Sequence, residues 1–141
     1  MGKKVREVMT PGPGTLPAAS SCAEAARLMR ARDVGAVIVT EGDGGQVCGI
    51  ITDRDIVVRC VAEGLDPEDT ALDEVCSHEL TRLSPDDEVD HAVEIMKRKA
   101  IRRIPVVEAD QPVGILSLGD LAIDRDPQSA LGNISQAPPN R

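Results

Sequence analysis

The sequence predicts an α/β (α+β) fold made of two pseudo-symmetric copies of one β-α-β-β-α unit, and three observations lead to that prediction. A seven-residue stretch occurs twice, as GIITDRD at residues 49–55 and as GILSLGD at residues 114–120. The flanking sequence also repeats, because a shift of 67 residues places the apolar positions of residues 25–29 on those of residues 92–96. The chain has 141 residues, and a copy of roughly 60 residues is marginal alone. We therefore expect the copies to fold as a pair.

Each copy begins with a short lead-in and a brief strand, and the helix that follows has one apolar stripe. The lead-in of the first copy, residues 5–9, has helical spacing and ends at Pro11-Gly-Pro-Gly14, a sequence that stops a helix. Ser20 and Asp87 are suitable N-caps for the helices. Behind them, apolar residues recur at i, i+3, i+4 and i+7, as Cys22, Ala25, Ala26 and Met29 and as Val89, Ala92, Val93 and Met96.

The second half of each copy is a predicted β-hairpin followed by another helix. Runs of β-branched residues around Gly, Asp and Pro turns are typical of buried strands. Pro105 has no amide hydrogen, so its strand should begin there or lie at an edge of its sheet. The predicted strands are residues 36–40, 47–51, 104–108 and 113–116, and the predicted helices run from 53 to about 63 and from 118 to about 123.

Composition excludes several classes of function. The net charge of −8 and the pI near 4.7 argue against a nucleic-acid binder, which needs a basic face. The absence of Phe, Tyr and Trp also removes base recognition by aromatic stacking. No apolar run approaches the roughly 18 residues of a membrane-spanning helix, and the N-terminus lacks the apolar core of a signal peptide. We expect a cytoplasmic protein that binds neither nucleic acid nor membrane.

Three of the four cysteines fall on positions that are apolar in the other copy, and none belongs to a C-x-x-C pair. We interpret them as small core residues that are reduced in the cytosol. The alternative is a metal site that uses Cys76, His78 and His91, but no fourth ligand follows at a usual zinc spacing. We therefore expect no metal. The cysteines are Cys22, Cys48, Cys60 and Cys76.

The repeated motif places a hydroxyl three residues before a carboxylate, as Thr52 and Asp55 in the first copy and as Ser117 and Asp120 in the second. A carboxylate is a two-acceptor group that suits a cis-diol, and a helix N-terminus offers N–H donors to an anion. The same spacing forms a capping box, in which the hydroxyl and the acid bind amides of the helix start. Both roles are compatible and stay open.

The order of elements and the recurrence of Gly-apolar-apolar-Thr/Ser-x-x-Asp resemble a tandem pair of CBS domains, the cystathionine β-synthase-type repeat that forms a Bateman module. The resemblance covers roughly residues 5–123. The stretch ITDRDIVVR, followed by Ala62-Glu-Gly-Leu-Asp-Pro67, is also similar to small stand-alone bacterial two-repeat proteins of the hypoxia-responsive type. The resemblance implies CBS repeats packed sheet to sheet, with repeat 1 at 5–65, a linker at 66–71, repeat 2 at 72–125 and a flexible tail at 126–141.

The resemblance also implies clefts for an adenosine-containing ligand such as AMP, ADP, ATP, NAD or S-adenosylmethionine. The family's ribose-binding Asp matches Asp55 and Asp120, and its phosphate-contacting Thr or Ser matches Thr52 and Ser117. Its Thr at the first strand matches Thr15.

A basic dipeptide before the hairpin strand of many family members matches Arg102-Arg103, which precedes Ile104-Pro105. The alternative for these two arginines is a solvated, cation-rich helix end. Arg54 is a further candidate for phosphate, or it pairs with a neighbouring acid. The first copy has Gly35-Ala36 where the second has the two arginines, so the two clefts should differ.

The resemblance implies a non-enzymatic regulatory module with an adenosyl small molecule as its ligand, no obligatory cofactor, and a homodimer or a separately encoded protein as its partner. The alternative is a structural or protein-interaction module whose clefts hold no ligand. An enzyme is not expected, because no nucleophile has an identifiable base and orienting group around it.

Overall fold

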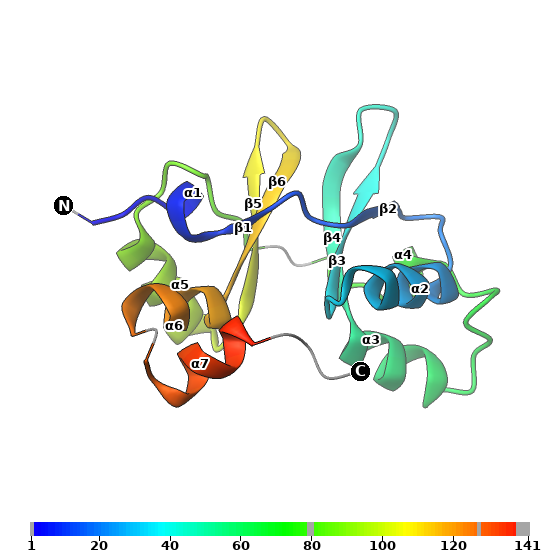
Figure 1. Ribbon diagram of the computed structural model, residues 1–141. Coiled ribbons are helices and arrows are strands. Elements are labelled where there is room, and N and C mark those ends of the chain that lie inside the picture. The colour runs from blue at the N-terminus through cyan, green and yellow to red at the C-terminus, as the bar shows by residue number, and fades with distance from the viewer. Residues whose placement is uncertain (1, 79–80, 127, 138–141) are drawn as a thin grey trace. The chain divides into compact units, whose positions relative to one another are not determined.

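The computed structural model describes residues 2–78, 81–126 and 128–137, and the chain divides into two compact units (Figure 1). Unit 1 consists of Met1–Gly12 and Thr81–Arg141, and unit 2 consists of Pro13–Leu80. The units therefore do not coincide with the two sequence copies, because the start of the chain belongs to the unit that holds the second copy. The predicted α/β class, with two small sheets and flanking helices, is confirmed.

Unit 2 is built on a three-stranded sheet in the order β2-β3-β4. Strand β2 is parallel to β3, and β3 and β4 form an antiparallel hairpin. Thr15 pairs with Ile38, and Ala36 pairs with Thr52. The starts of β2 and β3 and the end of β4 therefore lie at the same end of the sheet. The elements are β2 (Thr15–Pro17), α2 (Cys22–Arg32), β3 (Ala36–Glu41), β4 (Gln46–Thr52), α3 (Asp53–Ile56), η1 (Val57–Val61) and α4 (Leu72–Val75).

Unit 1 has the matching hairpin, but its three-stranded sheet differs, because the order is β1-β6-β5 and all pairs are antiparallel. The brief strand predicted at the start of the second copy is reduced to an isolated parallel bridge between Leu83 and Val106. Strand β5 is at one end of this order, as Pro105 predicts for its strand. Arg103 pairs with Ser117 across the hairpin. The elements are α1 (Val5–Val8), β1 (Thr10–Pro11), α5 (Val89–Lys99), β5 (Arg103–Glu108), β6 (Gln111–Ser117), α6 (Leu118–Arg125) and α7 (Ala130–Gln136).

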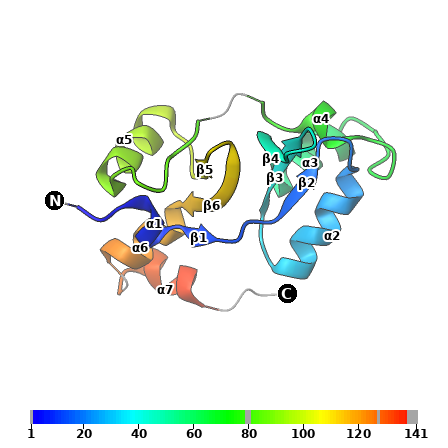
Figure 2. The same ribbon diagram turned by 90° about the horizontal axis from the view of Figure 1, so that it is seen from above.

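Each unit has its own hydrophobic core between the helices and one face of the sheet. Figure 2 shows α5 and α6 on the same side of β5 and β6. The predicted apolar stripe of α5 lies in or against its core, which confirms its helical periodicity. In α2 the stripe is narrower than predicted, because Cys22, Ala25 and Met29 are in the core but Ala26 is exposed. The core of unit 2 includes Cys22, Ala25, Met29, Val37, Val39, Ile51, Ile56 and Cys60, and that of unit 1 includes Val89, Ala92, Ile95, Met96, Ile104, Val106, Leu116 and Leu121.

The lead-in segments, residues 3–10 and 70–77, each pack on the copy that they do not precede. In unit 1, Val5 N–H donates to Asp87 O at 2.8 Å, and Val89 N–H donates to Lys3 O at 2.9 Å. In unit 2, the matching bonds join Leu72 N–H to Ser20 O at 2.8 Å and Cys22 N–H to Thr70 O at 2.9 Å. Each unit therefore needs a segment from elsewhere in the sequence to complete its helical layer.

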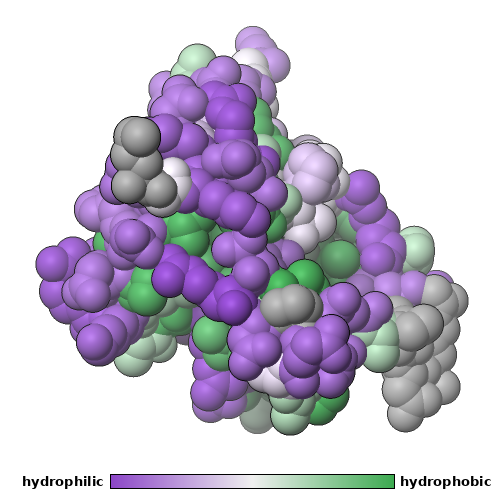
Figure 3. All heavy atoms as spheres, turned by 60° about the vertical axis from the view of Figure 1, so that its left-hand side comes forward, coloured by the Kyte–Doolittle hydropathy of each residue, from purple (hydrophilic) through white to green (hydrophobic). Residues whose placement is uncertain are grey.

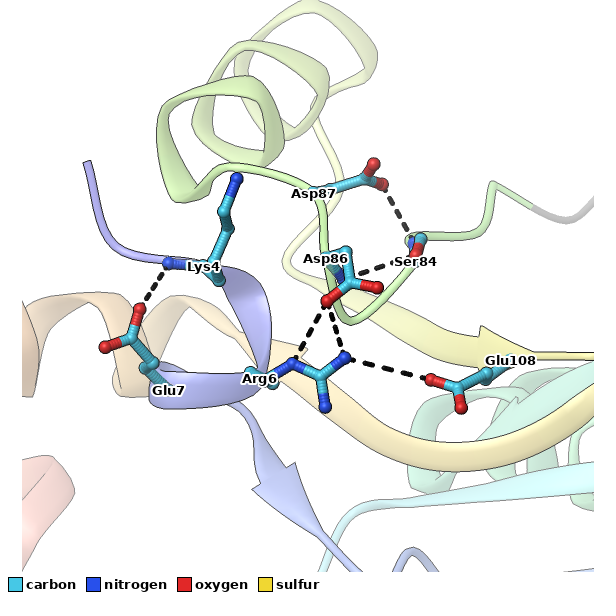
Figure 4. A network of polar contacts seen from close by, with 7 residues as sticks. All are labelled: Lys4, Arg6, Glu7, Ser84, Asp86, Asp87 and Glu108. Atoms are coloured by element: carbon cyan, nitrogen blue, oxygen red, sulfur yellow. Dashed lines mark hydrogen bonds and ion pairs between the residues drawn. The ribbon is translucent and has the colours of Figure 1, made fainter. Parts of the chain in front are cut away.

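Side chains strengthen this contact in unit 1 (Figure 4). The Arg6 guanidinium donates to Asp86 Oδ1 at 2.5 Å and lies 3.9 Å from Glu108 Oε2. The hydrogen bond from Arg6 to Asp86 raises the pKa of the guanidinium. Asp87 Oδ2 accepts the Ser84 amide at 2.8 Å and so stabilises the turn before α5.

The predicted N-caps Ser20 and Asp87 are wrong by one residue. Ser21 caps α2 by accepting the Glu24 amide at 3.1 Å, and Glu88 stands at the N-cap of α5 without a side-chain cap. The physical reason is the lead-in segments, since Ser21 and Glu88 form bridges with Ala71 and Lys4. Within each unit, backbone pairing between the lead-in segment and the residues before the helix determines where the helix starts. The apolar periodicity of the sequence carries no information about this pairing.

Two helical segments differ from the prediction. After one turn, α3 widens into the π-helix η1, in which Ala62 N–H donates to Val57 O at 2.8 Å, five residues back. In the segment 126–141, expected to be a flexible tail, the described residues 128–137 contain helix α7, whose N-cap Ser129 accepts the Gly132 amide at 3.0 Å. This helix packs along α6 through its buried Gly132, while its apolar residues Leu131 and Ile134 stay exposed. The prediction for residues 127 and 138–141 lies outside the described residues.

The surface is mostly hydrophilic, in keeping with the net charge of −8. Figure 3 shows polar residues over most of the face it brings forward, with apolar residues between them. Among the described residues, the large apolar side chains with the greatest exposure are Val57, Val61 and Ile134, at 57%, 56% and 72%. No helix in the described part of the chain has the length and apolar character needed to cross a membrane.

Candidate functional site

The repeated motif forms the same helix start in both units. In unit 2, Thr52 Oγ1 accepts the Asp55 amide at 3.1 Å, and Asp55 Oδ2 accepts the Thr52 amide at 2.9 Å. In unit 1, Ser117 Oγ accepts the Asp120 amide at 3.1 Å, and Asp120 Oδ2 accepts the Ser117 amide at 2.9 Å. The capping box is therefore formed in both copies. It uses one carboxylate oxygen and leaves Oδ1 outside the cap.

The first amides of α3 and α6 are not the free donors that the motif suggests. Asp53 N–H donates to Gly35 O at 3.0 Å, and Leu118 N–H donates to Arg102 O at 2.9 Å. Arg54 N–H donates to Asp53 Oδ1 at 2.8 Å. In α3 the first three amides are thus engaged within unit 2. The expectation that this helix start offers free N–H groups to an anion is wrong, so an anion there requires side-chain donors.

The glycine that leads each motif allows a lead-in segment to approach the strand. A Cβ on Gly49 would lie 2.9 Å from Cys76 Sγ and 3.0 Å from Ser77 O. A Cβ on Gly114 would lie 2.5 Å from Met9 Sδ and 3.0 Å from the carbonyl oxygen of Thr10. Both distances to backbone oxygen are tighter than ordinary packing permits. The glycines therefore bring residues 76–77 and 9–10 against the motif.

The two motif carboxylates have different neighbours at Oδ1. Asp120 Oδ1 accepts a hydrogen bond from the Thr10 hydroxyl at 3.0 Å. Asp55 Oδ1 lies 3.7 Å from Nη2 of Arg59, and Arg59 Nη1 donates to Val75 O at 3.0 Å and to Ser77 Oγ at 3.3 Å. Thr10 and Ser77 are the matching residues of the two lead-in segments. One lead-in contacts its carboxylate directly, and the other does so through an arginine.

The remaining candidates of unit 2 lie near the same end of the sheet. Thr15 begins β2 and is exposed, two strands from the end of β4 at Thr52. Arg54 is exposed beside the cap. The structure therefore brings Thr15, Thr52, Arg54 and Asp55 to one end of unit 2.

In unit 1 the hairpin places Arg103 directly across from Ser117. Arg102 and Arg103 are exposed, whereas Ile104 and Pro105 are buried, with Ile104 in the core. Helix α7 lies close to this cap, because a Cβ on Gly119 would be 2.9 Å from Ser135 Oγ. The unit thus gathers Arg102, Arg103, Ser117 and Asp120 around the start of α6, beside α7.

Sequence reasoning missed Arg59, Thr10 and Ser77. The i, i+4 spacing of Asp55 and Arg59 in TDRDIVVR was an available signal, since such pairs face each other on a helix. In the second copy, the position of Arg59 is occupied by Asp124, which pairs with Lys3 at 2.5 Å. Thr10 and Ser77 could be found only by knowing which copy each lead-in joins.

All four cysteines are free and lie in unit 2. Cys22, Cys60 and Cys76 are buried, which confirms their interpretation as core residues. Burial raises the pKa of Cys22 to about 12, aided by a hydrogen bond with Cys60. Burial also raises the pKa of Cys76 to about 11. Both thiols are therefore neutral and unreactive near pH 7.

The candidate metal ligands do not form a cluster. Cys76 Sγ lies 3.6 Å from His78 Nε2, but His78 also lies 2.9 Å from the carbonyl oxygen of Asp73, and His91 belongs to the other unit. Within residues 2–78, 81–126 and 128–137, no group of three His, Cys, Asp or Glu side chains suits a metal ion.

Comparison with known proteins identifies the family. The family model for the CBS domain matches residues 5–61 and 72–123. The CBS domain-containing protein YhcV of Bacillus subtilis is 39% identical over 135 residues, which cover 93% of this chain and 94% of that protein. Hypoxic response protein 1 of Mycobacterium tuberculosis is 30% identical over 117 residues, which cover 83% of this chain and 81% of that protein.

Solved structures show the same fold. A crystal structure of Hypoxic Response Protein I with two coordinated zinc ions has a TM-score of 0.77 and 28% identity, covering 85% of this chain and 97% of that chain. The CBS domain pair of MJ0100, solved in complex with 5′-methylthioadenosine and S-adenosyl-L-methionine, has a TM-score of 0.77 and 24% identity, covering 86% of this chain and 94% of that chain. Two matched repeats, a duplicated Thr/Ser-x-x-Asp helix start and these relatives lead to one conclusion: this chain is a member of the CBS-domain family, a paired-CBS regulatory module.

Proposed function

We propose that this CBS pair binds an adenosine-containing ligand, the class that includes AMP, ADP, ATP, NAD and S-adenosylmethionine. One observation carries the proposal. Asp55 and Asp120 are half-buried carboxylates whose Oδ2 atoms serve the helix cap and whose Oδ1 atoms lie outside it. An ionised carboxylate accepts hydrogen bonds only, and it suits the two adjacent hydroxyls of a ribose.

The comparison with MJ0100 supports the ligand class, because that CBS pair holds two adenosyl compounds in its crystal structure. Further residues of the proposed sites are those gathered around the two helix starts. Exposed side chains are proposed to contact the ligand directly, and the buried Ile104 and Pro105 to shape the hairpin beneath it. The exposed or half-buried set is Thr15, Thr52, Arg54, Arg102, Arg103 and Ser117.

In this proposal the chain acts by conformation and performs no chemical reaction. A ligand shifts a conformational equilibrium only by the difference between its affinities for the two states. Occupancy must therefore change how the CBS pair meets a second copy or a separately encoded protein. The free cysteines support a reducing, cytoplasmic setting.

Calorimetric titration of the whole chain with AMP, ATP, NAD and S-adenosylmethionine tests the proposal. We expect at least one ligand to bind, and Asp55→Ala or Asp120→Ala to weaken its site about 10- to 150-fold, the effect of losing a charged hydrogen bond. Asp43→Ala is the matched control, since Asp43 is exposed in the β3–β4 turn. Circular dichroism must show that each variant is folded. Heat from none of the ligands with folded protein would refute the proposal.

A second candidate function, a ligand-free interaction module that forms homodimers, is favoured by the apolar surface of η1. Val57, Val58 and Val61 of η1 are 57%, 42% and 56% exposed, and Leu65, after the end of η1, is 44% exposed. An exposed group of apolar residues is typical of protein interfaces. Light scattering should give twice the 14.9 kDa of one chain. Val57→Asp with Val61→Asp should give the monomer, and Val34→Asp, 42% exposed in the loop between α2 and β3, should not. A wild-type monomer would exclude the dimer.

A further inference from the structure

Arg59 lies at the motif carboxylate of unit 2 but has no role in forming the motif. Its Nη2 is 3.7 Å from Asp55 Oδ1, which is too far for a hydrogen bond. The arginine side chain is 48% exposed and that of Asp55 is 15% exposed. The guanidinium therefore stands at the solvent side of a carboxylate that is largely enclosed.

The lead-in segment holds this guanidinium in place. Its Nη1 donates to Val75 O at 3.0 Å and to Ser77 Oγ at 3.3 Å. Two acceptors on one nitrogen fix the plane of the fork, so an acceptor that reaches Nη2 finds a donor that is already oriented. The residue also lies in the π-helix η1, and such wide turns inside helices are frequent at functional sites.

The fold does not require a cation at this position. Unit 1 has the same hairpin, cap and leading glycine, and there the matching residue is Asp124, which pairs with Lys3. The first copy also has Gly35-Ala36 where the second has Arg102-Arg103. The first copy thus has no counterpart of Arg102-Arg103, and Arg59 of η1 places a guanidinium beside Asp55 instead.

We infer that Arg59 is a specificity-determining residue of the unit 2 site and that this site takes a nucleoside phosphate in preference to the uncharged nucleoside. The inference rests on the proposed ribose contact of Asp55. A guanidinium fork matches the oxygens of a phosphate, and the first amides of α3 are engaged within the unit. The side chain of Arg59 therefore supplies the donors that the helix start does not. The opposing interpretation is a surface ion pair, which contributes little to stability and nothing to binding.

The experiment compares AMP with adenosine by calorimetry in the full chain carrying Asp120→Ala, so that the unit 2 site is the one measured. We expect AMP to bind more tightly than adenosine. Adding Arg59→Gln should weaken AMP about 10-fold or more and leave adenosine within about twofold. Arg59→Lys should restore part of the AMP affinity, since it keeps the charge and loses the fork. Arg27→Gln is the matched control, because Arg27 is an exposed arginine of unit 2 that pairs with Glu68.

The outcomes separate this inference from the proposed function. Equal AMP affinity with and without Arg59→Gln, or equal affinity for AMP and adenosine, overturns the role of Arg59 while the ribose site stands. Loss of adenosine binding to the same extent as AMP also overturns it, because that result indicates a structural role. If the Asp120→Ala chain is folded and binds neither compound, the unit 2 site and the role of Arg59 both fall.

Discussion

Units 1 and 2 each have the same β-hairpin, helix cap and close-approach glycine, but their motif carboxylates have different neighbours. Asp120 Oδ1 accepts a hydrogen bond from the Thr10 hydroxyl, whereas Asp55 Oδ1 faces the guanidinium of Arg59 at 3.7 Å. The seven-residue motif accounts for the start of the helix in both units. The residues around it, from the lead-in segment and the next helical turn, determine which chemistry the carboxylate can support.

The difference arises because each lead-in segment brings its own residues to the motif. Met9 and Thr10 lie against Gly114, and Cys76 and Ser77 lie against Gly49. In unit 1 this backbone arrangement presents the thioether of Met9 and the hydroxyl of Thr10, which contacts Asp120 directly. In unit 2 it presents the thiol of Cys76 and the hydroxyl of Ser77, which accepts a hydrogen bond from Arg59. A change at either lead-in should therefore affect one unit and spare the other.

The largest effect is expected from removing the close approach itself. Gly49→Ala and Gly114→Ala would each place a Cβ 3.0 Å from a backbone oxygen, and overpacking of this kind typically costs about 1 to 3 kcal/mol. Urea unfolding followed by circular dichroism measures the loss, since the chain has no Trp or Tyr. Gly44→Ala, with open space around its Cβ, is the control. An unchanged stability of both variants would show that the lead-in segments can move away at little cost.

The sequence predicted much of the fold, because apolar periodicity and the duplicated motif are local properties. Strands β3 to β6, helices α2, α5 and α6 and the capping boxes follow from such patterns. The lead-in partners were not predictable, since nothing in residues 3–10 or 70–77 says which copy they join. Arg59 was missed for a related reason. Its importance depends on contacts with Val75 and Ser77, which lie 16 and 18 residues away along the chain.

The thiol in one lead-in should make unit 2 sensitive to alkali. Burial raises the pKa of Cys76 from 9.0 to about 11, so the fold favours the neutral thiol. That contribution is complete below pH 9 and is lost as the pH rises from 9 to 11. The stability advantage of the wild type over Cys76→Ala should fall by about 1 kcal/mol between pH 9 and pH 10. Met9→Ala in unit 1 should show no such pH dependence. If the stability difference from the wild type changed with pH in the same way for both variants, the expected contrast between the two lead-in segments would be contradicted.

Removing the cap hydroxyls should affect both units alike and so test what they share. Thr52→Ala and Ser117→Ala each remove the acceptor of an N3 amide at 3.1 Å, and loss of an N-cap costs about 1 kcal/mol. Thermal unfolding by circular dichroism measures the two losses. Conservative Thr52→Ser and Ser117→Thr should retain most of the stability. If one cap proved much more costly than the other, the helix starts would not be equivalent.

The smallest effect concerns the hydroxyl that distinguishes the Asp120 site. Thr10→Val removes the hydrogen bond to Asp120 Oδ1 at 3.0 Å and keeps the side-chain shape. The contact is exposed, so we expect a loss at the low end of the usual 0.5 to 1.5 kcal/mol. Ser77→Ala in unit 2 removes one of two acceptors of Arg59 Nη1, and Val75 O remains; its cost should be smaller still. Urea unfolding measures the loss of stability in both variants. A larger loss for Ser77→Ala than for Thr10→Val would contradict the expectation, because Asp55 would then depend more on its lead-in segment than Asp120 does.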